Sequence, residues 1–273
     1  MIPLAVTLLV ALPLLVLAIS FLFKKRFAAA GRLFLIHSLA PSLLDAGSFS
    51  VRGFHLLLDR LNAFDIRVGT LAEAIESKNI AAITFDDGYD DIMQIAPYLA
   101  EKGIPIMIFI PTATIGRRNQ WDNFLIAGRR QHLDEEQIRN LAAGGVAFGS
   151  HGHRHIDLTT LSSVQVTDEL QTSREILQEL TGQPIEYLTY PFGKYNRRVV
   201  EIAPEVGFRD ALLSEPGKWR PFMRGRIALG RFDSTISIDA SLRPGLLSGA
   251  QYLKCLIIGS FSHLTPLLQR FKL

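Results

Sequence analysis

Two adjacent carboxylates, Asp86 and Asp87, come directly after an apolar run that ends at Phe85. Carboxylates at the end of a buried strand are costly unless a proton, a cation or hydrogen bonds compensate their charge. His151 and His155 stand in the later segment SHGHRH, four positions apart, and two imidazoles at this spacing can bind one ion. We therefore predict that Asp87, His151 and His155 bind a divalent metal such as zinc. Asp86 is then free to act as a base, an arrangement suited to hydrolysis.

Each of these residues also has a simpler interpretation. Carboxylates after a strand often cap the next helix, but Asp90 and Asp91 are better placed for that role and we assign it to them. Histidines in a polar loop are often only exposed to solvent. His153 lies between the two candidate ligands, and we expect it to point away from the ion.

Other residues could line the same site. The segment Tyr190-Pro191-Phe192-Gly193 is either an ordinary strand-to-loop exit or a turn whose backbone N–H groups hold an oxyanion. Trp121 is either a sugar-stacking platform or part of loop packing. His37 follows the first predicted strand and could reach the rim of the site, although a buried structural histidine is an equal alternative. His55, His132 and His263 have no evident partners, and we assign them structural or surface roles.

The N-terminal region predicts a membrane anchor. No charged residue occurs from Ile2 to Phe23, and Lys24, Lys25 and Arg26 follow at once. At about 1.5 Å per residue this run can span a hydrocarbon core of ~30 Å. Because the charges follow the apolar run, we favour an uncleaved single-pass anchor over residues 1–26 rather than a signal peptide. The basic flank places the following domain on the cytoplasmic side.

The remaining composition sets weaker limits. A single cysteine, Cys255, excludes an intramolecular disulfide in this chain of 273 residues. The formal net charge is only +3, and no aromatic–basic pattern indicates a nucleic-acid partner. We interpret a late basic cluster as a solvated face rather than a phosphate site; it comprises Lys218, Arg220, Arg224, Arg226 and Arg231. We expect the tail, residues 242–273, to form amphipathic helices packed on the domain rather than lying on a membrane.

Strands and helices alternate between the anchor and the tail. We expect strands at 32–39, 66–68, 81–85, 104–110, 146–150, 186–190, 210–213 and 226–229. Predicted helices lie at 51–62, 71–77, around 92–99, after Asp134, after Ser162 and at 197–205, and residue pairs typical of capping boxes begin two of them, Asp134 with Gln137 and Ser162 with Gln165. This alternation predicts an α/β fold with a parallel sheet, either doubly wound or closed into a barrel, with its site at the carboxyl ends of the strands.

Three motifs together resemble a known family. TFDDG from Thr84, SHGHRH followed by IDLTTLS from Ser150, and YPFG from Tyr190 are similar in order and spacing to the leading motifs of the NodB-like polysaccharide deacetylases, carbohydrate esterase family 4. The similarity extends from about Leu33 to Asp233, and we place the domain at residues 32–235. Thr189 stands where many members carry an arginine that orients the catalytic aspartate, as in a subgroup that reads YPFG.

The resemblance implies a fold and a reaction. It implies a distorted (β/α) barrel of about seven strands, Asp86 as catalytic base, and Asp87, His151 and His155 as ligands of a divalent metal, usually zinc. The reaction would be hydrolysis of an N-acetyl group from an aminosugar such as N-acetylglucosamine in a glycan, and the family favours an extracytoplasmic location. A late leucine–histidine motif that supplies the general acid is missing, so we expect Arg226 or His37 to act as general acid or orienting group.

Two alternatives to this reaction stay open. The predicted anchor and the basic cluster favour a deformylase or deacetylase of a polyprenyl-phosphate-linked aminosugar. The missing acid favours a glycan-binding relative that has lost turnover. The oligomeric state is not predicted.

Overall fold

The computed structural model describes residues 32–40, 47–119, 130–243, 248–249, 251–252 and 254–255. The predicted anchor at residues 1–26 and most of the predicted tail at 242–273 lie outside this part of the chain. Within the described residues, none of the helices combines the length and apolar character needed to cross a bilayer. The anchor and the tail therefore stay predictions.

A mainly parallel sheet forms the centre of the molecule, as the alternation of strands and helices predicts. Six neighbouring parallel strands are β1 (Leu33–Ile36), β3 (Ile80–Phe85), β4 (Ile106–Ile110), β5 (Ala147–Ser150), β6 (Tyr187–Thr189) and β7 (Asp210–Leu213), in this order across the sheet. A short strand, β2 (Arg67–Val68), pairs with the start of β3. The predicted α/β class is thus confirmed.

One segment near the end of the domain joins the two edges of this sheet. Its first half, β9 (Met223–Gly225), pairs in parallel with β7, and its second half, β10 (Ile227–Ala228), pairs in parallel with β1. Because β9 and β10 are separated by Arg226 alone, the sheet closes on itself through this segment. An antiparallel strand, β8 (Trp219–Arg220), forms a hairpin with β9 that periodicity did not predict.

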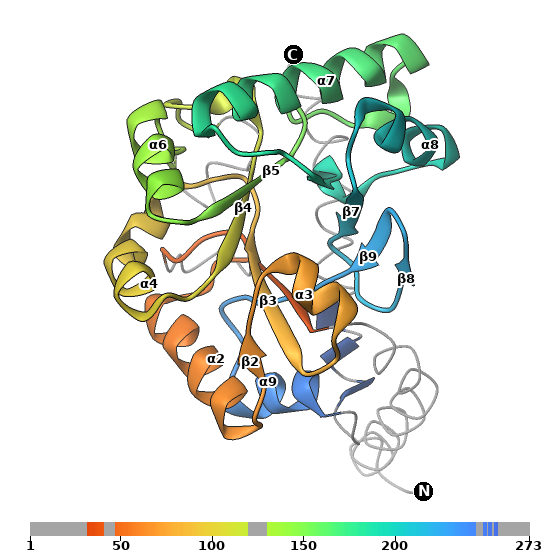
Figure 1. Cartoon of the computed structure of the whole chain (residues 1–273). Coiled ribbons are helices and arrows are strands. Elements are labelled where there is room, and N and C mark those ends of the chain that lie inside the picture. The colour runs from red at the N-terminus through yellow and green to blue at the C-terminus, as the bar shows by residue number, and fades with distance from the viewer. Residues whose placement is uncertain are drawn as a thin grey trace, which may run out of the picture.

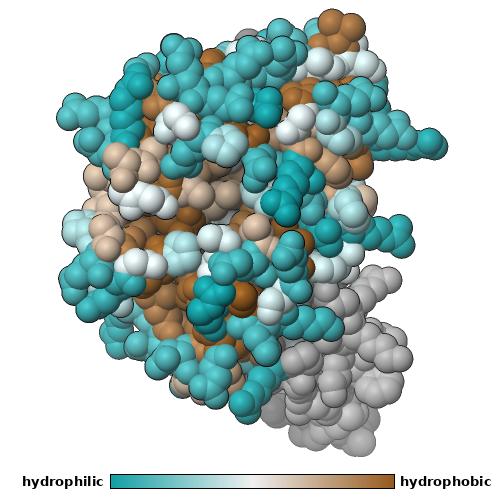
Figure 2. All heavy atoms as spheres, in the orientation of Figure 1, coloured by the Kyte–Doolittle hydropathy of each residue, from teal (hydrophilic) through white to brown (hydrophobic). Residues whose placement is uncertain are grey.

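Helices surround the strands (Figure 1). Those on the outside are α2 (Val51–Ala63), α4 (Ala96–Lys102), α6 (Glu135–Ala143), α7 (Ser163–Thr181) and α8 (Arg197–Val206), and α9 (Thr235–Leu242) packs on α2. Both predicted capping boxes are present, Asp134 with Gln137 at α6 and Ser162 with Gln165 at α7. Hydrophilic side chains cover the outer helices, and apolar ones show in the depressions between them (Figure 2).

The inside of the ring is filled by a small apolar cluster, distinct from the larger core between strands and helices. Its members are Leu33, Leu71, Ala74, Ala82, Met107, Phe109, Tyr187 and Leu212. The cluster includes two residues of α3 (Leu71–Glu76), so this helix covers one end of the ring. A Cβ on Gly149 would lie 2.4 Å from the Phe109 ring, which explains why a glycine faces this ring from β5.

Three local predictions were wrong or incomplete. The helix expected around 92–99 is divided into a 3₁₀ helix, η1 (Asp90–Gln94), and α4, which has Pro97 in its first turn. Asp90 and Asp91 do not cap by their side chains; instead the Asp91 carboxylate accepts the Ser38 hydroxyl and the Ala40 N–H. Helix α9 was not predicted.

The late basic residues do not form one solvated face. Arg226 is fully buried, and Arg224 forms an ion pair of 2.8 Å with Asp210, the first residue of β7, on the inner side of the ring. The prediction was wrong because both side chains face inward on the closing segment, a placement that depends on pairing with β7 and β1.

Candidate metal centre

Three side chains from two loops meet at the carboxyl ends of β3 and β5. The candidate ligand atoms of Asp87, His151 and His155 all lie within 4.8 Å of one another. The Nε2 atoms of His151 and His155 are 3.5 Å and 3.4 Å from Oδ1 of Asp87. Ligands about 2.0–2.1 Å from a tetrahedral ion are separated by roughly 3.3–3.4 Å, so this spacing fits a zinc-sized cation. The predicted convergence of these residues is observed.

Unusual backbone conformations present two of these ligands. Asp87 has φ +68° and His155 has φ +53°, values that non-glycine residues rarely adopt. The next residue, Gly88, also has a positive φ, and a Cβ there would lie 2.3 Å from Ile110. His132, which is buried, donates from Nδ1 to the Asp87 carbonyl over 2.8 Å. The loop after β3 is thus held in the conformation that turns Asp87 toward the histidines.

His151 is oriented by its second ring nitrogen. Its Nδ1 donates to the Thr189 carbonyl over 2.9 Å, and the Thr189 hydroxyl lies 2.6 Å from the same atom. This bond directs Nε2 toward Asp87, the arrangement that metal-binding histidines usually show. The His155 ring packs edge-on against the rings of His151 and Phe192, with centroid distances of 4.8 Å and 4.5 Å.

The surroundings of the two histidines favour the neutral form that a metal ligand requires. Burial lowers the pKa of His151, although the nearby Asp86 opposes that shift. Burial also lowers the pKa of His155 well below its ordinary value, and the adjacent His151 adds to this effect. Neutral imidazoles offer the lone pairs that a divalent cation binds.

Asp86 is not one of these three groups but lies beside them, held by Arg226. The Arg226 guanidinium donates from Nη1 and Nη2 to the two Asp86 oxygens over 2.7 Å and 2.6 Å. Arg226 also donates to the Thr84 hydroxyl and to the Leu213 carbonyl, and it lies 5.6 Å from the centre of the Phe109 ring. Both members of the pair are buried, with exposed fractions of 1% for Asp86 and 0% for Arg226.

This pair keeps Asp86 ionised. Burial alone would raise the pKa of the Asp86 carboxyl, but the charge and hydrogen bonds of Arg226 outweigh it and the pKa is lowered. A buried, ionised carboxylate therefore stands next to a potential cation site without belonging to its ligand set. Such a carboxylate can accept a proton from a water molecule at the site.

The remaining predicted residues occupy different positions. His37 is partly buried and near enough to influence the pKa values of Asp86, His151 and His155. His153 is outside the ligand group, as expected, and its Nδ1 shares a hydrogen bond of 2.8 Å with the Thr112 hydroxyl.

The four residues of the YPFG segment form a tight turn beside residues 151–155, which carry the two histidine ligands. The Tyr190 side chain is turned away, because its hydroxyl donates to the Phe222 carbonyl over 3.0 Å. Pro191 lies against Gly152, and Phe192 has φ +59°. Gly193 N–H closes the turn on the Tyr190 carbonyl. The backbone role predicted for this segment stays a prediction, and Trp121 lies outside the described residues.

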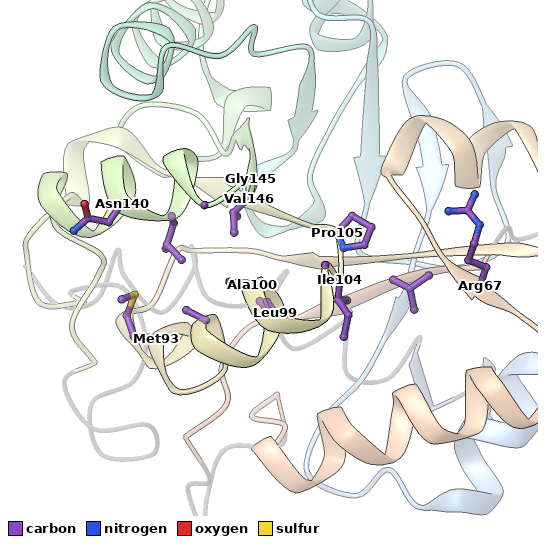
Figure 3. Close-up of a pocket in the computed structure, with 14 residues that line it drawn as sticks. Arg67, Met93, Leu99, Ala100, Ile104, Pro105, Asn140, Gly145 and Val146 are labelled. Atoms are coloured by element: carbon purple, nitrogen blue, oxygen red, sulfur yellow. The ribbon is translucent and has the colours of Figure 1, made fainter.

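A surface groove lies away from this group. A groove of about 600 Å³ runs between α4 and α6 and reaches the residues that precede β4 and β5, such as Pro105 and Val146 (Figure 3). Whereas the Asp–His–His group lies at the carboxyl ends of the strands, this groove lies at their amino ends. Its described lining is mostly apolar, with Arg67 and Asn140 the polar side chains, and it contains no histidine or carboxylate. The groove therefore offers none of the side chains that could bind a metal such as zinc, whereas the Asp–His–His group does.

Comparison with known proteins agrees with this choice. The family model for polysaccharide deacetylases matches residues 74–211, just over half of the chain. The chain belongs to the polysaccharide deacetylase family. The matched region of this deacetylase-family chain includes Asp86, Asp87, His151, His155 and the turn at 190–193. Arg226 lies beyond the matched region.

Individual proteins with deacetylase names are also similar to about half of this chain. The YxkH protein of Bacillus subtilis is 31% identical over 142 residues, 52% of this chain and 47% of that protein. The peptidoglycan-N-acetylmuramic acid deacetylase PdaA of the same organism is 25% identical over 133 residues, 48% of this chain and 45% of PdaA. In each case the match spans about half the length of the relative.

A solved structure supports the fold of this deacetylase-family chain. IcaB from Ammonifex degensii superposes with a TM-score of 0.65 at 23% identity, over 78% of this chain and 97% of that one.

The sequence predicts Arg226 as an orienting or acidic group of the site. It does not link His132 to the site, because no motif marks this residue and its contact with Asp87 arises only from the tertiary fold.

Proposed function

We propose that this protein is a metal-dependent hydrolase that removes the N-acetyl group from an N-acetylglucosamine-type residue of a polysaccharide or oligosaccharide. The observation that carries the proposal is the buried group Asp87, His151 and His155 next to an ionised Asp86 that is not part of it. The name of PdaA, a deacetylase of an N-acetylated sugar in peptidoglycan, supports the reaction class.

Asp87 and the two histidines would hold the cation, with zinc the ion we favour. A divalent cation supplies Lewis acidity, polarising an amide carbonyl and lowering the pKa of water. Asp86 accepts a proton from the water molecule that attacks the acetyl carbonyl carbon, while Arg226 keeps the carboxylate aligned. The bond between the carbonyl carbon and the sugar nitrogen then breaks, releasing acetate.

Two further groups complete the proposed reaction. The leaving nitrogen must gain a proton, and His37 is the donor we propose because it lies within electrostatic range of Asp86 and both histidine ligands. The developing oxyanion would be held by backbone N–H groups of the turn at 190–193, Phe192 in particular. We assign Trp121 a role in stacking on the sugar. With Arg226 aligning Asp86, no role as acid is left for it.

A lipid-linked substrate is the second candidate. The uncharged run from Ile2 to Phe23 favours an enzyme anchored in a membrane, which would bring it close to a polyprenyl-phosphate-linked aminosugar carrying an acetyl or formyl group. We also propose that the chain belongs to the YPFG-type subgroup, because Thr189 precedes the YPFG segment. A glycan-binding protein without turnover is the third candidate, favoured only by the missing leucine–histidine motif.

One assay separates these candidates. The purified full chain is incubated with free, polymeric and lipid-linked aminosugars carrying acetyl or formyl groups, and released acid is measured. We expect acetate release from at least one acetylated glycan, loss of more than nine-tenths of the rate with a chelator, and recovery on adding zinc. Sugar binding without release of acetate or formate would replace the hydrolase by the binding protein, and chelator-resistant release would contradict the role of the metal.

A further inference from the structure

The loop that carries two of the proposed ligands rests on a buried carboxylate of α7. Glu169 has an exposed fraction of 1%, although it lies on the face of α7 that also carries the buried Val166 and Leu170. Its Oε1 accepts the backbone N–H of Arg154, and its Oε2 accepts Nε of the same residue over 2.8 Å. Arg154 immediately precedes the ligand His155. Glu169 is therefore bonded directly to the segment between the two ligands.

A second buried contact holds the beginning of the same loop. The hydroxyl groups of Ser173 and Ser150 are 2.8 Å apart, and both residues are fully buried. Ser150 precedes the ligand His151, and its Oγ also accepts the Gly152 N–H over 3.1 Å. Ser173 lies one helical turn after Glu169, so one face of α7 binds the loop at both ends.

This loop needs external support. His155 is held at a positive φ, a conformation that is unfavourable for a non-glycine residue and persists only when its surroundings enforce it. Burying a carboxylate is also unfavourable unless its partners are well placed. The Arg154 side chain is 52% exposed, so solvent screens its ion pair with Glu169. The bond to the backbone N–H is the one that restrains the loop.

We propose that Glu169 and Ser173 are positioning residues that hold His151 and His155 at the separation required by the ion and thereby set the affinity for metal. This inference rests on the proposed metal-dependent function. Neither residue touches the cation; both act through the loop. Outer contacts of this kind typically change metal affinity 10–100-fold.

The test is a zinc titration of the metal-stripped full chain, with the Kd determined by competition against a chromophoric chelator. Glu169→Gln keeps the shape of the side chain but places an NH₂ group against the donors of Arg154. We expect the zinc Kd to rise about 10–100-fold. Glu179→Gln, on the exposed side of the same helix, is the matched control and should leave the Kd unchanged.

Two further measurements separate positioning from a purely structural role. The Tm of each metal-free variant reports stability alone, and the visible absorption of bound Co²⁺ reports the ligand geometry. Ser173→Ala, which removes only a neutral hydroxyl group, is the second variant and should raise the zinc Kd several-fold with an altered Co²⁺ spectrum.

The outcomes are distinct. If the wild-type protein does not bind zinc, the proposed function fails and this inference fails with it. If the wild type binds zinc and both variants bind it equally well, with lower Tm values only, the inference alone is overturned.

Discussion

Replacing Asp86 by asparagine is expected to reduce amide hydrolysis at least about 10²–10⁴-fold while metal stays bound, because a positioned general base contributes on this scale. Asparagine has the same shape but cannot accept the proton. Its single carbonyl oxygen also satisfies only part of the Arg226 guanidinium, which binds both oxygens in the native pair. The measurement is the initial rate of acetate release together with metal content per chain.

His151→Ala is the comparison for this variant. It removes a ligand that converges with Asp87 and His155, so both metal content and activity should be lost. The two variants therefore separate the base from the metal site. Equal residual activity in Asp86→Asn and His151→Ala, or loss of metal from Asp86→Asn, would contradict the roles assigned to these residues.

Replacing Arg226 by methionine is expected to affect both stability and rate. The substitution leaves the buried Asp86 carboxylate without its cation, and removing one member of a buried pair costs about 3–5 kcal/mol. Without Arg226, burial would raise the pKa of Asp86 and the proton-bound form could no longer act as base. We expect a lower free energy of unfolding in urea and a loss of kcat of at least about 10²-fold.

Arg226→Lys and Arg220→Met are the controls. Lysine retains the charge but cannot form two parallel hydrogen bonds with a carboxylate, so it should recover part of the stability and less of the rate. Arg220 lies on the same hairpin but is exposed, and its replacement should change neither quantity measurably. A kcat within twofold of the wild type for folded Arg226→Met would show that Asp86 does not need this partner.

The parts of the fold set by local patterns could be predicted from the sequence. Continuous apolar runs mark β3 and β4, and the capping boxes at Asp134 and Ser162 mark the first turns of α6 and α7. Because parallel strands place their carboxyl ends at one edge of the sheet, the sequence alone predicts that Asp87 lies near His151. These signals are local in the chain, or follow from the one rule about parallel sheets.

The supports of the site could not be predicted in the same way. Strands β9 and β10 contain three and two residues, too few for a periodic pattern, so the inward direction of Arg226 depends on pairing with β7 and β1. Glu169 is the one charged residue among the buried residues of α7, and nothing in the sequence links it to Arg154. Such contacts between distant segments appear only once the chain is folded.

The most direct measurement is a crystal structure of the zinc-loaded protein with anomalous diffraction recorded above and below the zinc absorption edge. We predict one ion, about 2.0–2.2 Å from an Asp87 oxygen and from Nε2 of His151 and His155, with the Asp86 carboxylate on Arg226 and outside the coordination sphere. An ion bound elsewhere, an ion ligated by Asp86, or no ion under saturating zinc would contradict the account.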